Sequence, residues 1–513
     1  MEGSSKYSEP NIFNQHHALR NYYPMTKEKL GNVYIFNHTK FDIVSLGERF
    51  GSMKDCKDIE EVFQNLKFDV VIYNDLAHTE ILKELSEIAA MNHANIDCLV
   101  IFVLTHGKNG KIFARDTDYY PDVYWKSFND CPSLMYKPKL IFIQAPCGDD
   151  TDDGVRINPV AHTDGPTPTT YSIPYVPDVL LMYSCYDGFT SWRSPVTGSS
   201  FVQCLCKEFK LRAKNADLLT LLTFLNRRMS MDFILVPSKS VSSSKPQIAT
   251  IVSTLNRVLF NLHYSFSDYY PMSKEKLGHV YVFNHVTFDS DSLGPRYGTM
   301  KDCRDIEEVF QNLKFDVIIY NDLGYKEILQ KLSNIGKMNY SNYSCLIIFV
   351  LTHGKNGKLF ARDTDYYPDV YWKIFNDSAS LRHKPKLIFI QDSCGDEAED
   401  EIYNVSIHPA AQADSVKSCI IPHIPDVLLM YSCYDGPYSW RSSVTGSSFV
   451  QCICKEFTQT ATTADLLTIL TFINRRMSLY FIKLPDKLSD DKKQVGTVVS
   501  TLTRILYFGT INQ

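Results

Sequence analysis

The sequence contains one long segment twice, and this duplication restricts the possible folds more than any other feature. YYPMTKEKLGNVYIFNH begins at Tyr22 and recurs almost unchanged as YYPMSKEKLGHVYVFNH from Tyr269. LTHGKNGKIFARDTDYYPDVYW, which contains His106, recurs around His353 at an offset of 247 residues. This period is far longer than the roughly 20–50 residues of a solenoid repeat, so each copy has the length of a whole domain.

The repeat divides the 513 residues into three predicted parts. These are a short N-terminal segment at residues 1–20, copy 1 at residues 21–262 and copy 2 at residues 263–513. With 44% hydrophobic and 22% charged residues, both copies have the composition of soluble globular domains.

Composition also excludes several classes of protein. A net charge of -5 argues against nucleic acid or an anionic membrane surface as a partner. The apolar runs are too short to span a bilayer, and the first twenty residues contain no apolar signal core. We therefore expect a cytoplasmic protein, in which the 14 cysteines are free thiols.

Each copy alternates short apolar segments with amphipathic ones. In copy 1 the apolar segments lie at residues 33–38, 69–76, 98–107, 139–144 and 178–184. Near-continuous apolarity is typical of strands buried on both faces. The alternation predicts an α/β fold with a mainly parallel central sheet flanked by helices, in two tandem copies. In such sheets ligands bind beyond the carboxyl ends of the strands.

The residues at those strand ends resemble the caspases, cysteine endopeptidases that cut after aspartate. The matching segments of copy 1 are RFGSMKDCKDIEEVF from Arg49, VLTHGKNG from Val103, KPKLIFIQ from Lys137, MYSCYDGFTSWR from Met182 and IVSTLNRVLF from Ile251. Copy 2 carries the equivalent segments in the same order. The resemblance implies a tandem duplication of an effector-type caspase domain, with last strands at residues 251–260 and 498–508.

A cysteine peptidase needs a thiolate, a histidine that activates it and donors for the oxyanion. Caspases place the histidine in a His-Gly dipeptide, so the resemblance assigns catalytic positions to His106, Gly107, His353 and Gly354. The family's cysteine lies in a Gln-Ala-Cys-(Arg or Gln)-Gly segment. Here the aligned segments read QAPCG from Gln144 and QDSCG from Gln391.

Pro146 and Ser393 therefore occupy the two nucleophile positions. Proline has no nucleophile and no backbone N–H for the oxyanion. A serine hydroxyl needs a finely aligned base, and caspases lack a buried carboxylate that would orient their histidine. We therefore predict that both copies lack peptidase activity.

The alternative is an active Asp-specific cysteine endopeptidase of apoptosis that uses Cys147 or Cys394, one residue downstream. A shift of one residue along an extended segment turns the side chain to the opposite face. A local bulge could restore the direction of either thiol.

The substrate pocket of the family is retained in both copies. Caspases hold the substrate aspartate between two arginines and a glutamine, because a guanidinium binds a carboxylate bidentately. The matching positions are Arg49, Gln144 and Arg193 in copy 1, Arg296, Gln391 and Arg441 in copy 2, and Trp192 and Trp440 in the neighbouring apolar subsite.

The connectors within each copy also resemble those of the family. Asp153, Asp164 and Asp414 each precede a small residue and are candidate cleavage sites, although Asp-Gly pairs are equally common in turns. Together these features predict a tandem pseudo-caspase, a regulator or decoy in apoptosis that needs no cofactor and no metal. The expected partners are a caspase-family protein, or the two copies paired as an internal pseudo-dimer, with Asp-containing peptides as candidate ligands. Activation and inhibition of a partner are both compatible with the sequence.

Overall fold

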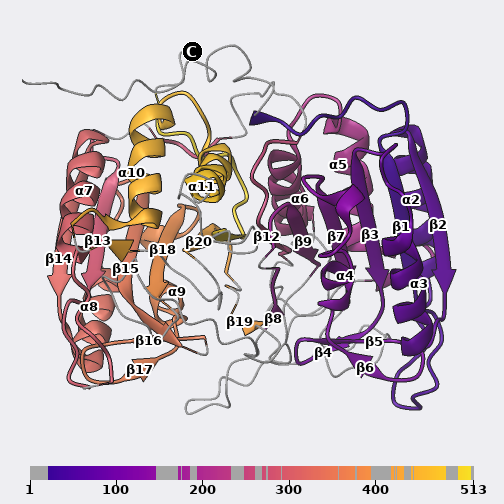
Figure 1. Ribbon diagram of the computed structural model, residues 1–513, viewed down its shortest axis with the longest axis horizontal. Coiled ribbons are helices and arrows are strands. Elements are labelled where there is room, and N and C mark those ends of the chain that lie inside the picture. The colour runs from indigo at the N-terminus through magenta and orange to yellow at the C-terminus, as the bar shows by residue number, and fades with distance from the viewer. Residues whose placement is uncertain are drawn as a thin grey trace, which may run out of the picture.

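The central sheet runs through both copies of the repeat (Figure 1). The computed structural model describes residues 21–145, 171–174, 176–184, 193–232, 248–259, 269–272, 275–290, 292–355, 357–375, 378–393, 418–420, 422, 424–432, 441–442, 444–480 and 495–509. Within these residues each copy is the predicted α/β unit.

The strands of the central sheet follow the same order in each copy. In copy 1 the order from the outer edge inward is β2 (Phe68–Asn74), β1 (Gly31–Asn37), β3 (Cys98–Leu104), β7 (Lys139–Gln144), β9 (Val179–Tyr183) and β12 (Thr250–Ser253). In copy 2 it is β14 (Phe315–Asn321), β13 (Gly278–Asn284), β15 (Cys345–Lys355), β18 (Lys386–Ser393), β20 (Val427–Tyr431) and β23 (Thr497–Ser500). All neighbours within a copy are parallel except the last strand, so the prediction of a mainly parallel sheet is confirmed.

Helices cover both faces of the sheet. One face carries α2 (Ser52–Asn65), α5 (Ser200–Arg212) and α6 (Leu218–Asp232), and in copy 2 α7 (Thr299–Asn312), α10 (Ser448–Thr460) and α11 (Leu466–Tyr480). The other face carries α3 (His78–Ala90) and α4 (Val123–Lys126), and in copy 2 α8 (Tyr325–Lys337) and α9 (Val370–Lys373). Each face buries one hydrophobic cluster, and each cluster contains residues of both copies.

Short strands surround the carboxyl ends of the large strands, and one 3-10 turn in each copy lies at the amino end of β7 or β18. In copy 1 they are β4 (Gly107–Lys108), β5 (Lys111–Phe113), β6 (Asp118–Tyr119), β8 (Tyr171–Ser172), β10 (Arg193–Ser194), β11 (Gly198–Ser199) and the 3-10 turn η2 (Pro132–Leu134). In copy 2 they are β16 (Lys358–Phe360), β17 (Asp365–Tyr366), β19 (Ser418–Cys419), β21 (Arg441–Ser442), β22 (Gly446–Ser447) and η4 (Ala379–Leu381).

The last strands meet at the junction of the two copies. β12 and β23 pair antiparallel, with Val252 opposite Val499, and both side chains are fully buried. β8 and β19 form a second antiparallel pair between the copies. The segments predicted as last strands, residues 251–260 and 498–508, are strands only at their beginnings. After Ser253 the chain leaves the sheet, and the carbonyl of Leu259 accepts a hydrogen bond from the N–H of Leu218 at the start of α6 (2.8 Å).

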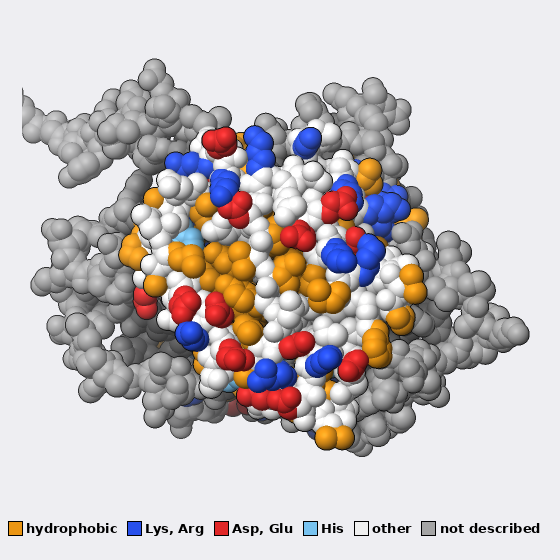
Figure 2. Space-filling view, turned by 90° about the vertical axis from the view of Figure 1, so that its right-hand side faces the viewer, with side chains coloured by type: hydrophobic (Ala, Val, Ile, Leu, Met, Phe, Trp, Pro, Cys, Tyr) orange, Lys and Arg blue, Asp and Glu red, His pale blue; other side chains and the backbone are white. Residues whose placement is uncertain are grey.

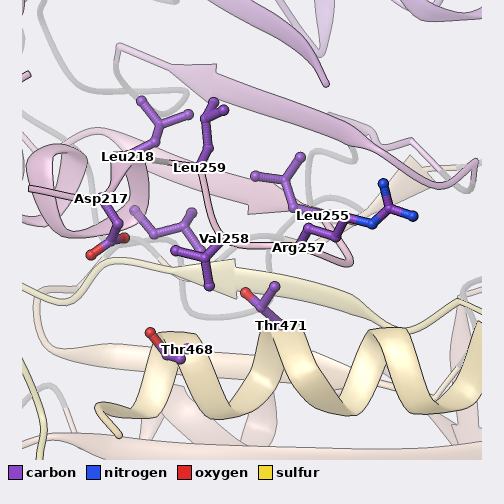
Figure 3. Close-up of a pocket in the computed structure, with 9 residues that line it drawn as sticks. Asp217, Leu218, Leu255, Arg257, Val258, Leu259, Thr468 and Thr471 are labelled. Carbon is purple, nitrogen blue, oxygen red and sulfur yellow. The ribbon is translucent and has the colours of Figure 1, made fainter. Parts of the chain in front are cut away.

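The junction also encloses a cavity, shown in Figure 3. Leu255, Val258 and Arg257 line it from the segment after β12, and Thr468 and Thr471 line it from α11. Asp217, which precedes α6, lies at the same cavity and is buried.

The outer edges of the sheet are β2 and β14. On the copy 1 end, apolar side chains gather in the middle of the face and charged side chains surround them (Figure 2). The exposed apolar side chains of this end include Met53 of α2, Val71 of β2 and Leu82 of α3. The outer edges of β2 and β14 therefore pair with no other described strand, whereas the inner edge strands β12 and β23 pair with each other.

The cysteines of the described residues are buried and free, as predicted. No helix in the described part of the chain combines the length and the apolarity needed to cross a membrane.

Candidate active site

Both predicted catalytic histidines lie at the carboxyl end of a central strand. His106 follows β3, and His353 lies near the end of β15. The Nε2 atom of His106 lies 3.1 Å from the carbonyl oxygen of Gly47, and the Nε2 atom of His353 lies 3.0 Å from that of Gly294. A phenylalanine ring packs 4.9 Å from each imidazole, centroid to centroid, and these rings are Phe41 and Phe288.

This contact determines the tautomer of each imidazole. A carbonyl oxygen only accepts hydrogen bonds, so Nε2 must carry the proton and donate it. In the neutral imidazole the other ring nitrogen, Nδ1, is then an acceptor, which is the state that can take a proton from a nucleophile. A backbone carbonyl thus orients the histidine in each copy, where many hydrolases use a carboxylate.

The strand ladder of copy 2 defines the nucleophile position. In the pairing of β15 with β18, Leu351 lies opposite Gln391, and His353 lies opposite Ser393. In copy 1 the last pair of the ladder between β3 and β7 is Leu104 opposite Gln144, so the ladder ends two residues before His106. On the adjacent strand, the backbone of Ser393 therefore lies directly beside that of His353.

The pocket arginine and glutamine meet in both copies. A guanidinium N–H of Arg49 donates to Oε1 of Gln144, and Arg296 makes the same bond to Gln391. The second guanidinium nitrogen of Arg49 donates to the carbonyl of His38 at 3.0 Å. Both arginines and both glutamines are fully buried, so a carboxylate that reached them would bind in a poorly hydrated environment.

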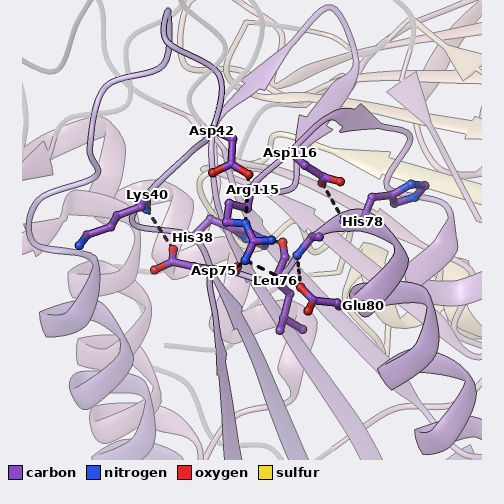
Figure 4. A network of polar contacts seen from close by, with 10 residues as sticks. His38, Lys40, Asp42, Asp75, Leu76, His78, Glu80, Arg115 and Asp116 are labelled. Carbon is purple, nitrogen blue, oxygen red and sulfur yellow. Dashed lines mark hydrogen bonds and ion pairs between the residues drawn. The ribbon is translucent and has the colours of Figure 1, made fainter.

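A polar network supports the loop that carries Arg49 (Figure 4). Arg115 donates to the carboxylate of Asp42 at 3.2 Å and to the backbone carbonyl of Asp75 at 3.1 Å. The Asp75 carboxylate accepts the N–H groups of Thr39 (2.6 Å) and Lys40 (3.0 Å).

The histidine before this loop is an uncharged structural group. The Nε2 atom of His38 lies 3.1 Å from the carbonyl of Leu76. Burial lowers the pKa of His38 to about 4, and it does the same to His285 in copy 2. The neutral imidazole of His38 therefore holds the strand end before this loop without contributing a charge near neutral pH.

The second pocket arginine lies on a small hairpin. Arg193 of β10 pairs with Ser199 of β11, and Arg441 of β21 pairs with Ser447 of β22. The N–H of Ser199 donates to the buried carboxylate of Asp55 in the first turn of α2, at 2.8 Å. Asp302 makes the equivalent bond in copy 2.

Several predicted site residues fall outside the described part of the chain. These are Pro146, Cys147, Trp192, Cys394, Trp440 and the candidate cleavage sites Asp153, Asp164 and Asp414. For Ser393, Arg193 and Arg441 the backbone alone is described. Their assigned roles remain predictions.

Three groups that position the site were not predicted from the sequence. The carbonyls of Gly47 and Gly294 carry no residue signature, because every residue has a carbonyl. The phenylalanines beside the histidines are separated from them by more than sixty residues of chain. Asp55 could have been suspected, because an acidic residue in the first turn of an otherwise amphipathic helix is a recognisable signal.

Comparison with known proteins assigns the family. A family model described as the caspase domain matches residues 31–260 and again residues 277–507. Caspase-1 of Spodoptera frugiperda is 39% identical over 262 residues, which make up 50% of this chain and 87% of that protein. Caspase drICE of Drosophila melanogaster is 40% identical over 241 residues, 46% of this chain and 71% of that protein. A crystal structure of caspase-1 from Spodoptera frugiperda aligns with 33% identity and a TM-score of 0.40 over 49% of this chain and 97% of that one. The chain therefore belongs to the caspase family and carries two caspase domains in tandem.

Proposed function

We propose that this protein is a pseudo-caspase that regulates caspase signalling in apoptosis as a decoy. It binds Asp-containing segments that active caspases also recognise, and it does not cut them. The observation that carries this proposal is the combination of an oriented histidine and a complete Arg–Gln pair with nucleophile positions that hold Pro146 and Ser393.

Because Pro146 and Ser393 replace the cysteine at the nucleophile positions, we expect no turnover. Removing the nucleophile of a related hydrolase costs on the order of 10⁶ in rate, and one oxyanion donor accounts for a further ~10²–10³. The pairing of Ser393 with His353 supports an assignment of this serine, and not the following cysteine, to the nucleophile position.

The buried arginines support recognition of aspartate. A guanidinium that already donates to Gln144 and to the His38 carbonyl is fixed in place, so little side-chain entropy is lost when it binds a carboxylate.

The junction favours a decoy over a subunit that joins an active caspase. β12 and β23 pair with each other along their free edges. A separate caspase molecule could pair with either strand only after this contact is broken. We therefore expect the two copies to act as an internal pseudo-dimer.

One experiment on the purified full chain tests the proposal. We expect calorimetry to detect binding of a peptide that ends in aspartate, and no release of a fluorophore from an Asp-ending substrate. The double substitution Arg49→Ala with Arg296→Ala should weaken binding at least tenfold, whereas Lys83→Ala with Lys331→Ala on the surface should not.

The same preparation is then treated with an Asp-directed irreversible inhibitor and digested for mass spectrometry. Turnover together with an adduct on Cys147 or Cys394 would replace this proposal with an active peptidase. Absence of peptide binding in both copies would contradict the decoy role.

A further inference from the structure

Copy 2 contains a buried carboxylate at the edge of its candidate active site. Asp392 lies between the pocket residue Gln391 and the nucleophile position Ser393, and it is 7% exposed. The equivalent residue of copy 1 is Ala145, which is also buried. The two copies therefore differ by one buried carboxyl group at this position.

The strand register places Asp392 on a definite face. Asp392 lies opposite Thr352, and His353 lies opposite Ser393. Side chains alternate along a strand, so Asp392 shares a face with Thr352 and Gly354 and not with His353. It is therefore not placed as the acid of a Ser-His-Asp triad.

The carboxylate packs directly against the glycine of the His-Gly dipeptide. A methyl group added to Gly354 would lie 2.6 Å from Oδ2 of Asp392 and 2.8 Å from its Cβ. Ser432, which is fully buried after β20, directs its hydroxyl to the backbone carbonyl of Asp392 (3.2 Å) and to its Oδ1 atom (3.4 Å). The acid is thus held at the strand ends from two sides.

We propose that Asp392 is an electrostatic barrier to thiolate formation at the nucleophile position of copy 2. The inference rests on the proposed function, in which Ser393 marks the nucleophile position. A thiolate and an oxyanion are both negative, and a carboxylate on the preceding residue of the strand disfavours both.

The test introduces a thiol and then removes the charge. Ser393→Cys is made in the full chain together with Cys394→Ser, so that one thiol remains in the segment. The same pair is combined with Asp392→Ala, the copy 1 residue, and separately with Asp392→Asn, which keeps the size and the hydrogen-bonding groups. Alkylation of the introduced thiol by iodoacetamide is followed against pH and assigned by mass spectrometry.

We expect the apparent pKa of the introduced thiol to fall by about 1–2 units, and its alkylation at pH 7 to become at least tenfold faster, when Asp392 is replaced by either residue. Agreement between the two replacements separates charge from packing. Equal thiol pKa values with and without Asp392 would overturn the inference. The proposed function is contradicted by a different result, namely peptide turnover by the unsubstituted chain. Thiol alkylation in these variants does not measure that turnover.

Discussion

At the scale of single residues, the two copies differ at the second position of their first strands, where copy 1 is partly exposed and copy 2 is buried. Copy 1 has Asn32 where copy 2 has His279, which is 7% exposed. The ring of His279 packs 4.5 Å from Tyr343 and 6.2 Å from Tyr340, and neither of its nitrogens has a hydrogen-bond partner among the described residues. Burial lowers the pKa of His279, so its neutral form is favoured in the folded chain.

This burial makes the stability of copy 2 dependent on pH. Because the folded-state pKa lies below the unfolded value of about 6.5, stability is fully present above that pH and falls as the solution becomes more acidic. We expect His279→Asn, which installs the copy 1 residue, to reduce the loss of melting temperature between pH 7.5 and pH 5. An unchanged loss in thermal unfolding would show that His279 does not contribute. Asn32→Ala serves as the matched control in copy 1.

At the scale of elements, α2 packs against the hairpin of β10 and β11, which carries the pocket arginine Arg193. Its N-cap, Gly51, has a φ of 83°, and Gly198 of β11 has a φ of 82°. A Cβ on Gly198 would lie 2.2 Å from the Asp55 carboxylate, so only glycine allows this approach. The contact fixes the hairpin that contains Arg193 against the helix.

Asp55 is therefore a positioning residue for the pocket. We expect Asp55→Ala to lower the free energy of unfolding by about 2–3 kcal/mol, because it leaves the buried N–H of Ser199 without its acceptor. It should also weaken binding of an Asp-ending peptide to copy 1, measured by calorimetry in an Arg296→Ala background. Asp58→Ala, which removes a surface pair with Lys54 on the same helix, should change stability by less than about 0.5 kcal/mol. Similar effects of the two substitutions would contradict this role.

At the scale of the whole molecule, the junction places two acidic helix caps close together. Asp217 directly precedes α6 and accepts the N–H of Thr220 in its first turn. Asp465 directly precedes α11 and accepts the N–H and the hydroxyl of Thr468 in its first turn. Burial and repulsion from Asp217 raise the pKa of Asp465 to about 6 from its ordinary value of 3.8. Arg257 also lines this cavity.

A raised folded-state pKa gives a stability contribution that is complete below about pH 3.8 and is lost as the pH rises through 6. We expect Asp465→Asn to stabilise the chain at pH 7.5 by about 1–2 kcal/mol and to flatten its pH dependence between 4 and 7. The effect is measured by denaturant unfolding at several pH values. Asp217→Asn and the double substitution complete a cycle, and the double should gain less than the sum of the singles. Additive effects would contradict the coupling of the two acids.

Much of the fold follows from local pattern. The apolar segments at residues 139–144 and 178–184 correspond closely to β7 and β9, because strands buried on both faces leave a continuous signal. The last strands were predicted too long, since the apolar residues after Ser253 are buried outside the sheet. An apolar run reports burial and does not distinguish a strand from a packed loop.

The sequence by itself determined that the chain holds two caspase domains and that proline and serine stand at the nucleophile positions. Both conclusions depend on residue identity and order, which the sequence states directly. Only the tertiary structure decided that Gly47 and Gly294 orient the histidines, that Asp392 packs against Gly354, and that β12 pairs with β23. These contacts join backbone atoms, or residues far apart in the chain, and their formation depends on strand register and packing rather than on any local motif.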